Sequence, residues 1–215
     1  DQQLLYIADR LFIDDAEVKR SPKQNIGGWV SGGDIKYLDQ PDVNGNYDNV
    51  IDSNDRQYTG MPTTPEIVYG FGPSFRYKKF DFSFFFQGAA RVSIMMNGIH
   101  PFGDGETRSV LQFIADDYWS EDNQNIYAKY PRLSKRDNPN NTAWSTYWQR
   151  NGAFLKLKNA EIGFNHKFFR IYLRGSNLLT FSPFKYWDPE MGSGSGLSYP
   201  TQRVFNVGVQ FSINK

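Results

Sequence analysis

The stretch EIVYGFGPSFRYKKFDFSFFFQGAARVSIMMNG, residues 66–98, decides the fold class because apolar side chains recur in it at every second position. One parity holds Ile67, Tyr69, Phe71, Phe75 and Tyr77 before the turn at Lys78 and Lys79, and Phe80, Phe82, Phe84 and Phe86 after it. The other parity after the turn holds Asp81, Ser83, Phe85 and Gln87. A period of two residues indicates β-strands. The stretch therefore predicts two strands joined as a hairpin.

The C-terminal third repeats the alternation. Residues 154–181, FLKLKNAEIGFNHKFFRIYLRGSNLLTF, predict two strands around a short turn at 165–167. Residues 203–215, RVFNVGVQFSINK, predict another strand whose apolar face holds Phe205, Val207, Val209, Phe211 and Ile213. Residues 3–13, QLLYIADRLFI, predict one more, so the chain supplies about six strands.

The connections between these strands alternate strictly in length. The turns near Lys78 and His166 are a few residues long, whereas residues 14–65, 97–153 and 181–202 form long connections rich in Gly, Pro, Asn and Asp. Long loops in a compact domain are usually functional or disordered. Strands that alternate apolar and polar, joined by short turns at one end and long loops at the other, are typical of antiparallel transmembrane β-barrels.

A soluble alternative has to be weighed against the barrel. A secreted β-sandwich, such as a carbohydrate-binding module, also alternates, but branched aliphatic side chains dominate its core and its connections need not sort by length. The apolar parity here is mostly Phe and Tyr, and aromatic residues make up 17% of the chain. Transmembrane barrels carry girdles of aromatic residues on their lipid-facing surface, so this aromatic face favours the barrel.

Composition excludes several other classes. The 215 residues carry a formal net charge of +1, which gives no electrostatic footprint for nucleic acid. There are no cysteines, so disulfides, thiolate zinc sites and cysteine nucleophiles are excluded. His100 and His166 are the two histidines and lie far apart in the sequence. No stretch is long and apolar enough for a transmembrane helix. We expect no enzymatic activity.

Six blocks that occur in order carry a family resemblance. They are GGDIKYLD at 32–39, VIDSNDR at 50–56, FDFSFFFQGA at 80–89, GAFLKLKNAEIGF at 152–164, LRGSNLLTFS at 173–182 and WDPE at 187–190. Together they resemble the C-terminal part of the SusC/RagA family of TonB-dependent outer-membrane transporters. The resemblance covers most of the chain.

The resemblance implies a larger protein and several partners. Members of this family have a plug inside a 22-stranded barrel, a class whose lumen the plug fills. They import oligosaccharides or peptides across the outer membrane of Gram-negative, Bacteroidetes-type cells, and they work with a SusD-like surface lipoprotein and the TonB complex. Residues 1–215 then represent the C-terminal portion of such a barrel, in contact with membrane lipid and with the N-terminal barrel strands and plug. The three long connections would lie outside the cell.

One acidic stretch, DVNGNYDNVIDSND at 42–55, predicts a structural Ca²⁺ site. An EF-type loop takes oxygen ligands at positions 1, 3, 5, 7, 9 and 12. With Asp55 at position 12 and a two-residue insertion, the ligands would be Asp42, Asn44, Asp48, Val50, Asp52 and Asp55. Asn, Asp and Gly also build Asx-turns without an ion, so an ion-free loop is an equal alternative.

A second stretch, FKYWDPEMGSGSGLSYP at 184–200, predicts a surface for substrate or for the lipoprotein lid. Its candidate residues are Tyr186, Trp187, Asp188, Glu190 and Tyr199. Aromatic rings stack on sugars or peptide side chains, and carboxylates accept hydrogen bonds from hydroxyl groups. The alternative is that Trp187 packs within its own loop. Two carboxylates only two residues apart do not suit glycoside hydrolysis.

Overall fold

The computed structural model describes residues 3–101 and 109–212, and the chain divides into two compact units. Unit 1 comprises residues 1–61, 94–150 and 193–195, and unit 2 comprises residues 62–93, 151–192 and 196–215. None of the helices in the described ranges has the length and apolar composition needed to cross a membrane.

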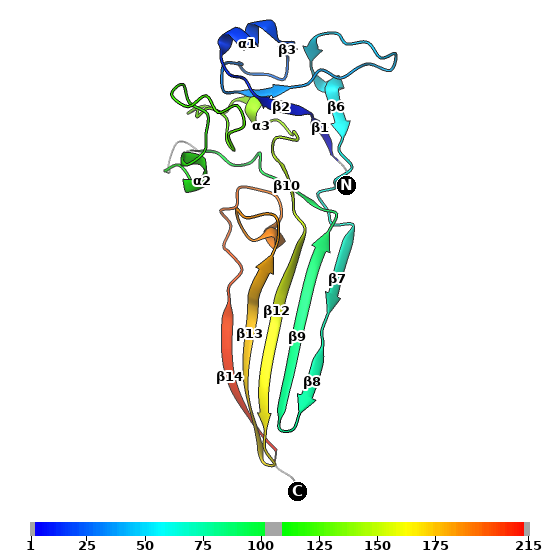
Figure 1. Ribbon diagram of the computed structural model, residues 1–215, viewed down its shortest axis with the longest axis vertical. Coiled ribbons are helices and arrows are strands. Elements are labelled where there is room, and N and C mark those ends of the chain that lie inside the picture. The colour runs from blue at the N-terminus through cyan, green and yellow to red at the C-terminus, as the bar shows by residue number, and fades with distance from the viewer. Residues whose placement is uncertain (1–2, 102–108, 213–215) are drawn as a thin grey trace. The chain divides into compact units, whose positions relative to one another are not determined.

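Unit 2 is built on one antiparallel sheet, the long arrows of Figure 1. The strand order is β14-β13-β12-β9-β7, and β8 also pairs with β9. The strands are β7 (Ile67–Phe71), β8 (Ser74–Tyr77), β9 (Phe80–Ala90), β12 (Phe154–Asn165), β13 (Phe169–Phe181) and β14 (Val204–Phe211).

The hairpin predicted from residues 66–98 is confirmed, with one interruption. β7 and β8 keep the same register against β9, in which Phe71 pairs with Phe86 and Ser74 with Ser83. The strand assignment breaks at residues 72–73 because Pro73 has no backbone N–H to donate. β7 and β8 therefore act as one strand along the edge of β9. The two-residue turn after β8 places Lys78 at φ 54°.

The two strands predicted around residues 165–167 are also confirmed as β12 and β13, with an irregularity near their far ends. Leu157 pairs with Phe86 on β9, but Ala160 pairs with Phe84, so Lys158 is an extra residue on β12. Such a bulge shifts the register by one residue. Because of it, Leu157 and Ala160 lie on the same face of the sheet although they are three residues apart.

The last strand is confirmed as β14, and its predicted residue Ile213 lies outside the described residues. The prediction of one strand at residues 3–13 is wrong. That segment forms two short strands, β1 (Leu4–Tyr6) and β2 (Ala8–Leu11), which pair in unit 1 with β6 and β4. Alternation over so few residues does not specify the pairing partner, and here the partners come from the long connection that follows.

Unit 1 is a separate compact body made from the N-terminal residues and parts of all three long connections. Its further elements are α1 (Asp15–Arg20), β3 (Lys23–Gln24), β4 (Ile35–Tyr37), β5 (Val50–Ile51), η1 (Ser53–Asp55), β6 (Arg56–Tyr58), α2 (Gln112–Ala115) and α3 (Pro139–Thr142). Short β10 (Ser93–Met95) pairs with β11 (Gln149–Asn151). Apolar side chains such as Leu5, Leu11, Ile35 and Ile114 are fully buried in this unit. These connections are therefore folded segments with a core of their own.

Buried polar groups hold the segments of unit 1 together. Asp34 is fully buried and accepts hydrogen bonds from Arg132 Nε at 2.7 Å and from Asn141 Nδ2 at 2.8 Å. Tyr37 donates its hydroxyl proton to the Asn140 carbonyl at 2.6 Å. Burial stabilises the neutral phenol, so the pKa of Tyr37 is raised. These bonds tie residues 34–37 to residues 132–141, about a hundred positions later in the sequence.

Candidate functional site

The sheet of unit 2 has two chemically different faces, and cross-strand pairing shows which residues share a face. Apolar residues line up in rows across the strands. In order from the end with the long connections, the rows of this apolar face are Tyr69, Gly88, Leu155 and Phe181; Phe71, Phe86, Leu157 and Leu179; Phe84, Ala160, Gly175 and Phe205; Phe75, Phe82, Ile162, Leu173 and Val207; and Tyr77, Phe80, Phe164, Ile171 and Val209.

Much of this apolar face is open to the surroundings. Val207 is 75% exposed, Phe205 is 64% exposed and Phe181 is 56% exposed. Removing one apolar side chain of this size from water stabilises a protein by about 1.5–3 kcal/mol, so leaving many of them in water would be costly. A contiguous exposed apolar surface of this kind marks contact with a membrane or another apolar partner.

The opposite face is mostly polar. Its rows include Ser74, Ser83, Glu161, Arg174 and Asn206, and Arg76, Asp81, Gly163, Tyr172 and Gly208. Here the guanidinium of Arg170 reaches Asp81 Oδ1 at 2.5 Å and Glu161 Oε1 at 2.6 Å, and Asn165 also donates to Asp81. Ion pairs with several hydrogen bonds are stronger than single exposed pairs.

An ion cluster centred on Lys156 of β12 joins this strand to the loop that follows β13. The side chain of Lys156 is 2% exposed, and its Nζ lies 2.5 Å from Asp188 Oδ2 and 2.8 Å from Glu190 Oε2. Lys158 Nζ lies 2.8 Å from Glu190 Oε1. Two cations and two carboxylates therefore balance, which a buried charge requires.

Burial by itself would raise the pKa values of both carboxylates, because it disfavours their charged forms. Hydrogen bonds from Lys156 outweigh this effect, and the pKa values of Asp188 and Glu190 are lowered. Both predicted carboxylates are therefore charged and engaged with this chain's own lysines. Their role toward a substrate or lid stays a prediction.

Trp187 packs within its own loop, as the alternative for this stretch expects. Its ring lies edge-on to Phe184 with centroids 4.7 Å apart, and its Nε1 donates to the Gly192 carbonyl at 3.0 Å. A Cβ on Gly196 would lie 2.4 Å from the Trp187 ring, so only glycine fits there. Tyr199 is 78% exposed and is open to an external partner.

The acidic stretch at 42–55 is held by hydrogen bonds from backbone N–H groups. Asp42 Oδ1 accepts from Asn44 N at 2.8 Å, and Asp48 Oδ1 accepts from Val50 N at 2.8 Å. These are Asx-turns, in which the side chain bonds its own backbone two residues on.

The third turn of this stretch is a capping box. Asp52 Oδ1 accepts from Asn54 N at 2.8 Å, and Asp55 Oδ2 accepts from Asp52 N at 2.7 Å. Within the described residues, no three His, Asp or Glu side chains converge as a metal site. The geometry of the six predicted ligands thus fits the ion-free alternative, and the Ca²⁺ site stays a prediction.

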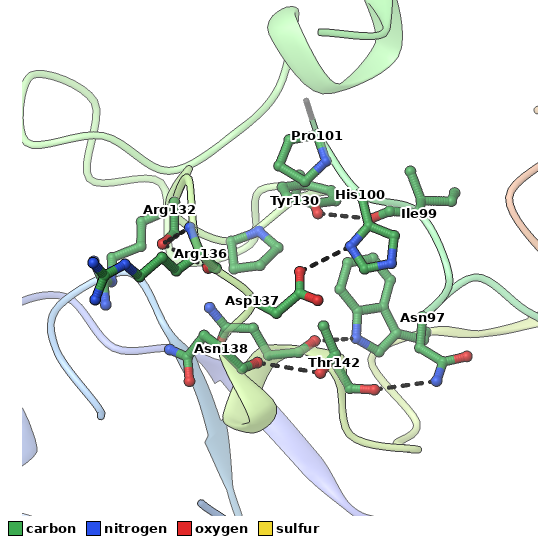
Figure 2. A pocket seen from close by; sticks show the side chains of 14 residues that line it. Asn97, Ile99, His100, Pro101, Tyr130, Arg132, Arg136, Asp137, Asn138 and Thr142 are labelled. Carbon is green, nitrogen blue, oxygen red and sulfur yellow. Dashed lines mark hydrogen bonds and ion pairs between the residues drawn. The ribbon is translucent and has the colours of Figure 1, made fainter. Parts of the chain in front are cut away.

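Unit 1 contains a small cavity of about 30 Å³ (Figure 2). His100 Nδ1 lies 2.9 Å from Asp137 Oδ1, and Asn97 Nδ2 donates to the Thr142 carbonyl at 3.1 Å. A cavity of this size holds one or two water molecules. It is too small for a nutrient, and its polar groups contact one another.

Two groups of residues escaped the sequence analysis. Lys156 lies in a predicted strand, and only its contacts with the carboxylates of WDPE, about 30 residues later, show that it is buried and paired. Asp34 lies in the block GGDIKYLD, and its partners Arg132, Asn138 and Asn141 lie about a hundred residues away. The Asn-rich stretch at 138–141 was the available signal, because buried amides need partners.

No profile of a known protein family matches the chain. Two proteins of Formosa agariphila are similar to it, each 29% identical. TonB-dependent receptor P3 matches 78% of this chain and 18% of its own length, and TonB-dependent receptor P26 matches 91% and 20%. The chain thus spans about a fifth of the length of these relatives.

Solved structures of the RagAB peptide transporter share the fold. One matches with a TM-score of 0.65 at 18% identity, covering 98% of this chain and 22% of the solved chain. The RagAB importer in its open-open state matches with a TM-score of 0.64 over 97% of this chain. The chain is thus similar to TonB-dependent receptors, and it shares its fold with the RagAB structures, in agreement with the resemblance found in the sequence. These relatives are named as receptors and importers, which confirms the prediction of a non-enzymatic role.

Proposed function

We propose that this SusC/RagA-type chain forms part of the wall of a nutrient importer in the outer membrane. The sheet of unit 2 would contact lipid with its apolar face and line the interior with its polar face. The single observation that carries this proposal is the division of one sheet into an exposed apolar face and a hydrogen-bonded polar face. Transmembrane barrels show this division, whereas soluble sheets bury their apolar face.

The two edge strands of the sheet indicate that further strands complete the barrel wall. β7 with β8 forms one edge and β14 the other. In hydrocarbon each unpaired backbone group costs several kcal/mol, so open edges do not occur there. Strands from elsewhere in the same transporter would pair with these edges and close a 22-stranded barrel around a plug.

The relatives support the wider assignment. The solved relatives are titled as peptide importers, and the curated relatives as TonB-dependent receptors from Formosa agariphila. We propose that the whole protein imports an oligosaccharide or a peptide, works with a SusD-like lipoprotein and the TonB complex, and belongs to a Bacteroidetes-type cell. The short turns would lie in the periplasm and the long connections outside the cell.

A pair of neighbouring residues on β14 tests the membrane proposal. Val207 lies on the apolar face and Asn206 on the polar face. Each would be replaced by a spin-labelled cysteine in the full-length transporter, and collisions with oxygen and with a water-soluble nickel chelate would be measured. Oxygen partitions into lipid and the chelate does not, so Val207→Cys should favour oxygen and Asn206→Cys the chelate.

The competing secreted β-sandwich predicts a different pattern. Its apolar face would be a core that neither reagent reaches, and the protein would remain soluble without detergent. A label at position 207 that the chelate reaches as readily as one at position 206 would also contradict the membrane proposal.

A further inference from the structure

The loop after β13 returns over one face of the sheet. Residues 183–192, called the strap, include η3 (Pro189–Met191), which lies beside the end of β13 in Figure 1. The strap carries Asp188 and Glu190, the partners of Lys156. All of these residues belong to unit 2.

Cross-strand pairing identifies the face that the strap covers. Lys156 pairs with Gln87 on β9 and with Thr180 on β13. Its neighbours Leu155 and Leu157 lie on the apolar face, so Lys156 lies on the polar face. Because the Lys156 side chain is 2% exposed and contacts two strap carboxylates, the strap covers the polar face at Lys156.

We propose that the strap folds into the interior of the transporter, where Lys156 and Lys158 hold it against the inner wall and it narrows the passage. This inference rests on the proposed function, which assigns the polar face to the interior. On the lipid side the strap would carry two charges into hydrocarbon at high cost. On the inner side, the two lysines balance those charges.

The local structure suits a fixed strap. Lys158 is the extra residue of the β12 bulge, and bulges re-aim side chains. It joins Lys156 in contacting Glu190, so four charges connect β12 to the strap. Trp187 closes the strap on itself through its bond to the Gly192 carbonyl. The strap is held at one point by charge and at another by packing.

Thiol labelling tests the strap. Adjacent residues of β9 face opposite sides, with Gln87 in the Lys156 row and Phe86 on the apolar face. Single Gln87→Cys and Phe86→Cys variants of the full-length transporter, in a cysteine-free background, would react in outer membranes with a charged, membrane-impermeant maleimide. Each would be combined with Lys156→Met, with Asp188→Asn plus Glu190→Gln, and with the control Lys185→Met, an exposed lysine of the same strap.

The expected result is slow labelling of Gln87→Cys while the strap is held. Lys156→Met and the Asp188→Asn/Glu190→Gln pair should each accelerate it about tenfold, which corresponds to weakening the docked strap by about 1.4 kcal/mol. Lys185→Met should leave the rate unchanged. Phe86→Cys should stay unlabelled in every background.

The outcomes separate the two proposals. If the Asp188→Asn/Glu190→Gln transporter, whose sheet residues are intact, labels Gln87→Cys at the original rate, the strap proposal fails. If Phe86→Cys reacts as fast as Gln87→Cys, the lipid-facing assignment fails, and the proposed function with it.

Discussion

Ala160 gives the sharpest test of the lipid-facing assignment, because it lies in the third of the five apolar rows. From Phe80 to Gly88, the strand β9 crosses all five rows. Eight steps of about 3.3 Å, at a tilt of about 40°, span about 20 Å along the membrane normal. This approaches the apolar band of about 25 Å in outer-membrane barrels, and it places Ala160 near the middle.

Room for a larger side chain exists at Ala160. An apolar groove of about 310 Å³ is lined by Phe82, Phe84 and Phe205 together with the small residues Ala160 and Gly175. An arginine at position 160 therefore has space for its side chain. Its cost should come from placing a charge in hydrocarbon, about 2–4 kcal/mol at the midplane.

The assay is guanidinium-induced unfolding of the full-length protein reconstituted in lipid vesicles. Ala160→Arg should lower the free energy of unfolding by about 2–4 kcal/mol. Ala160→Leu is the size control and should change it by less than about 1.5 kcal/mol. Ser83→Arg, on the polar face beside Glu161, controls for added charge and should be near neutral.

An Ala160→Arg protein as stable as the Ala160→Leu protein would contradict the lipid-facing position of residue 160. A face in contact with water accepts a surface arginine within about 0.5 kcal/mol. A destabilising Ser83→Arg together with a neutral Ala160→Arg would reverse the assignment of the two faces.

Three further predictions concern unit 1. Calcium and chelator should leave the melting temperature unchanged, because the carboxylates of residues 42–55 already accept backbone N–H groups; a rise with calcium would support the ion site instead. For Glu17, burial raises the pKa, but hydrogen bonds from Arg10, Lys36 and the Ile13 N–H outweigh burial and lower the pKa from its ordinary value of 4.5 to about 2. The stabilisation from charged Glu17 is therefore complete above pH 4.5 and is lost as the pH falls toward 2. Unfolding titrations at pH 5.5 and at pH 2 should show that this group accounts for about 2–3 kcal/mol of the loss of stability on acidification, and Glu17→Gln should remove that part of the loss. Asp34→Ala leaves the Arg132 charge without this carboxylate and should lower the free energy of unfolding by about 3–5 kcal/mol. The loss should be measured as faster amide hydrogen exchange at residues 132–141. The control Asp137→Ala, at an exposed carboxylate, should leave that exchange unchanged.

The strands and their faces could be predicted because the signal for them is local. Residues two positions apart in a strand point to the same side, so alternation of Phe and polar residues specifies both the strand and its apolar face. The turns at Lys78 and at residues 165–167 then set the pairing between neighbours. For the same reason residues 3–13 were misjudged, since a few alternating residues do not say which strand they join.

The sequence by itself thus determined the antiparallel hairpins and the separation of an apolar from a polar face, because both follow from neighbours along the chain. Only the tertiary structure decided that the long connections build a unit with its own core, that Asp34 meets Arg132, and that Lys156 lies buried beneath Asp188 and Glu190. Those contacts join residues about 30 to 100 positions apart. Burial and charge pairing at that range depend on how distant segments pack, which no periodicity along the chain records.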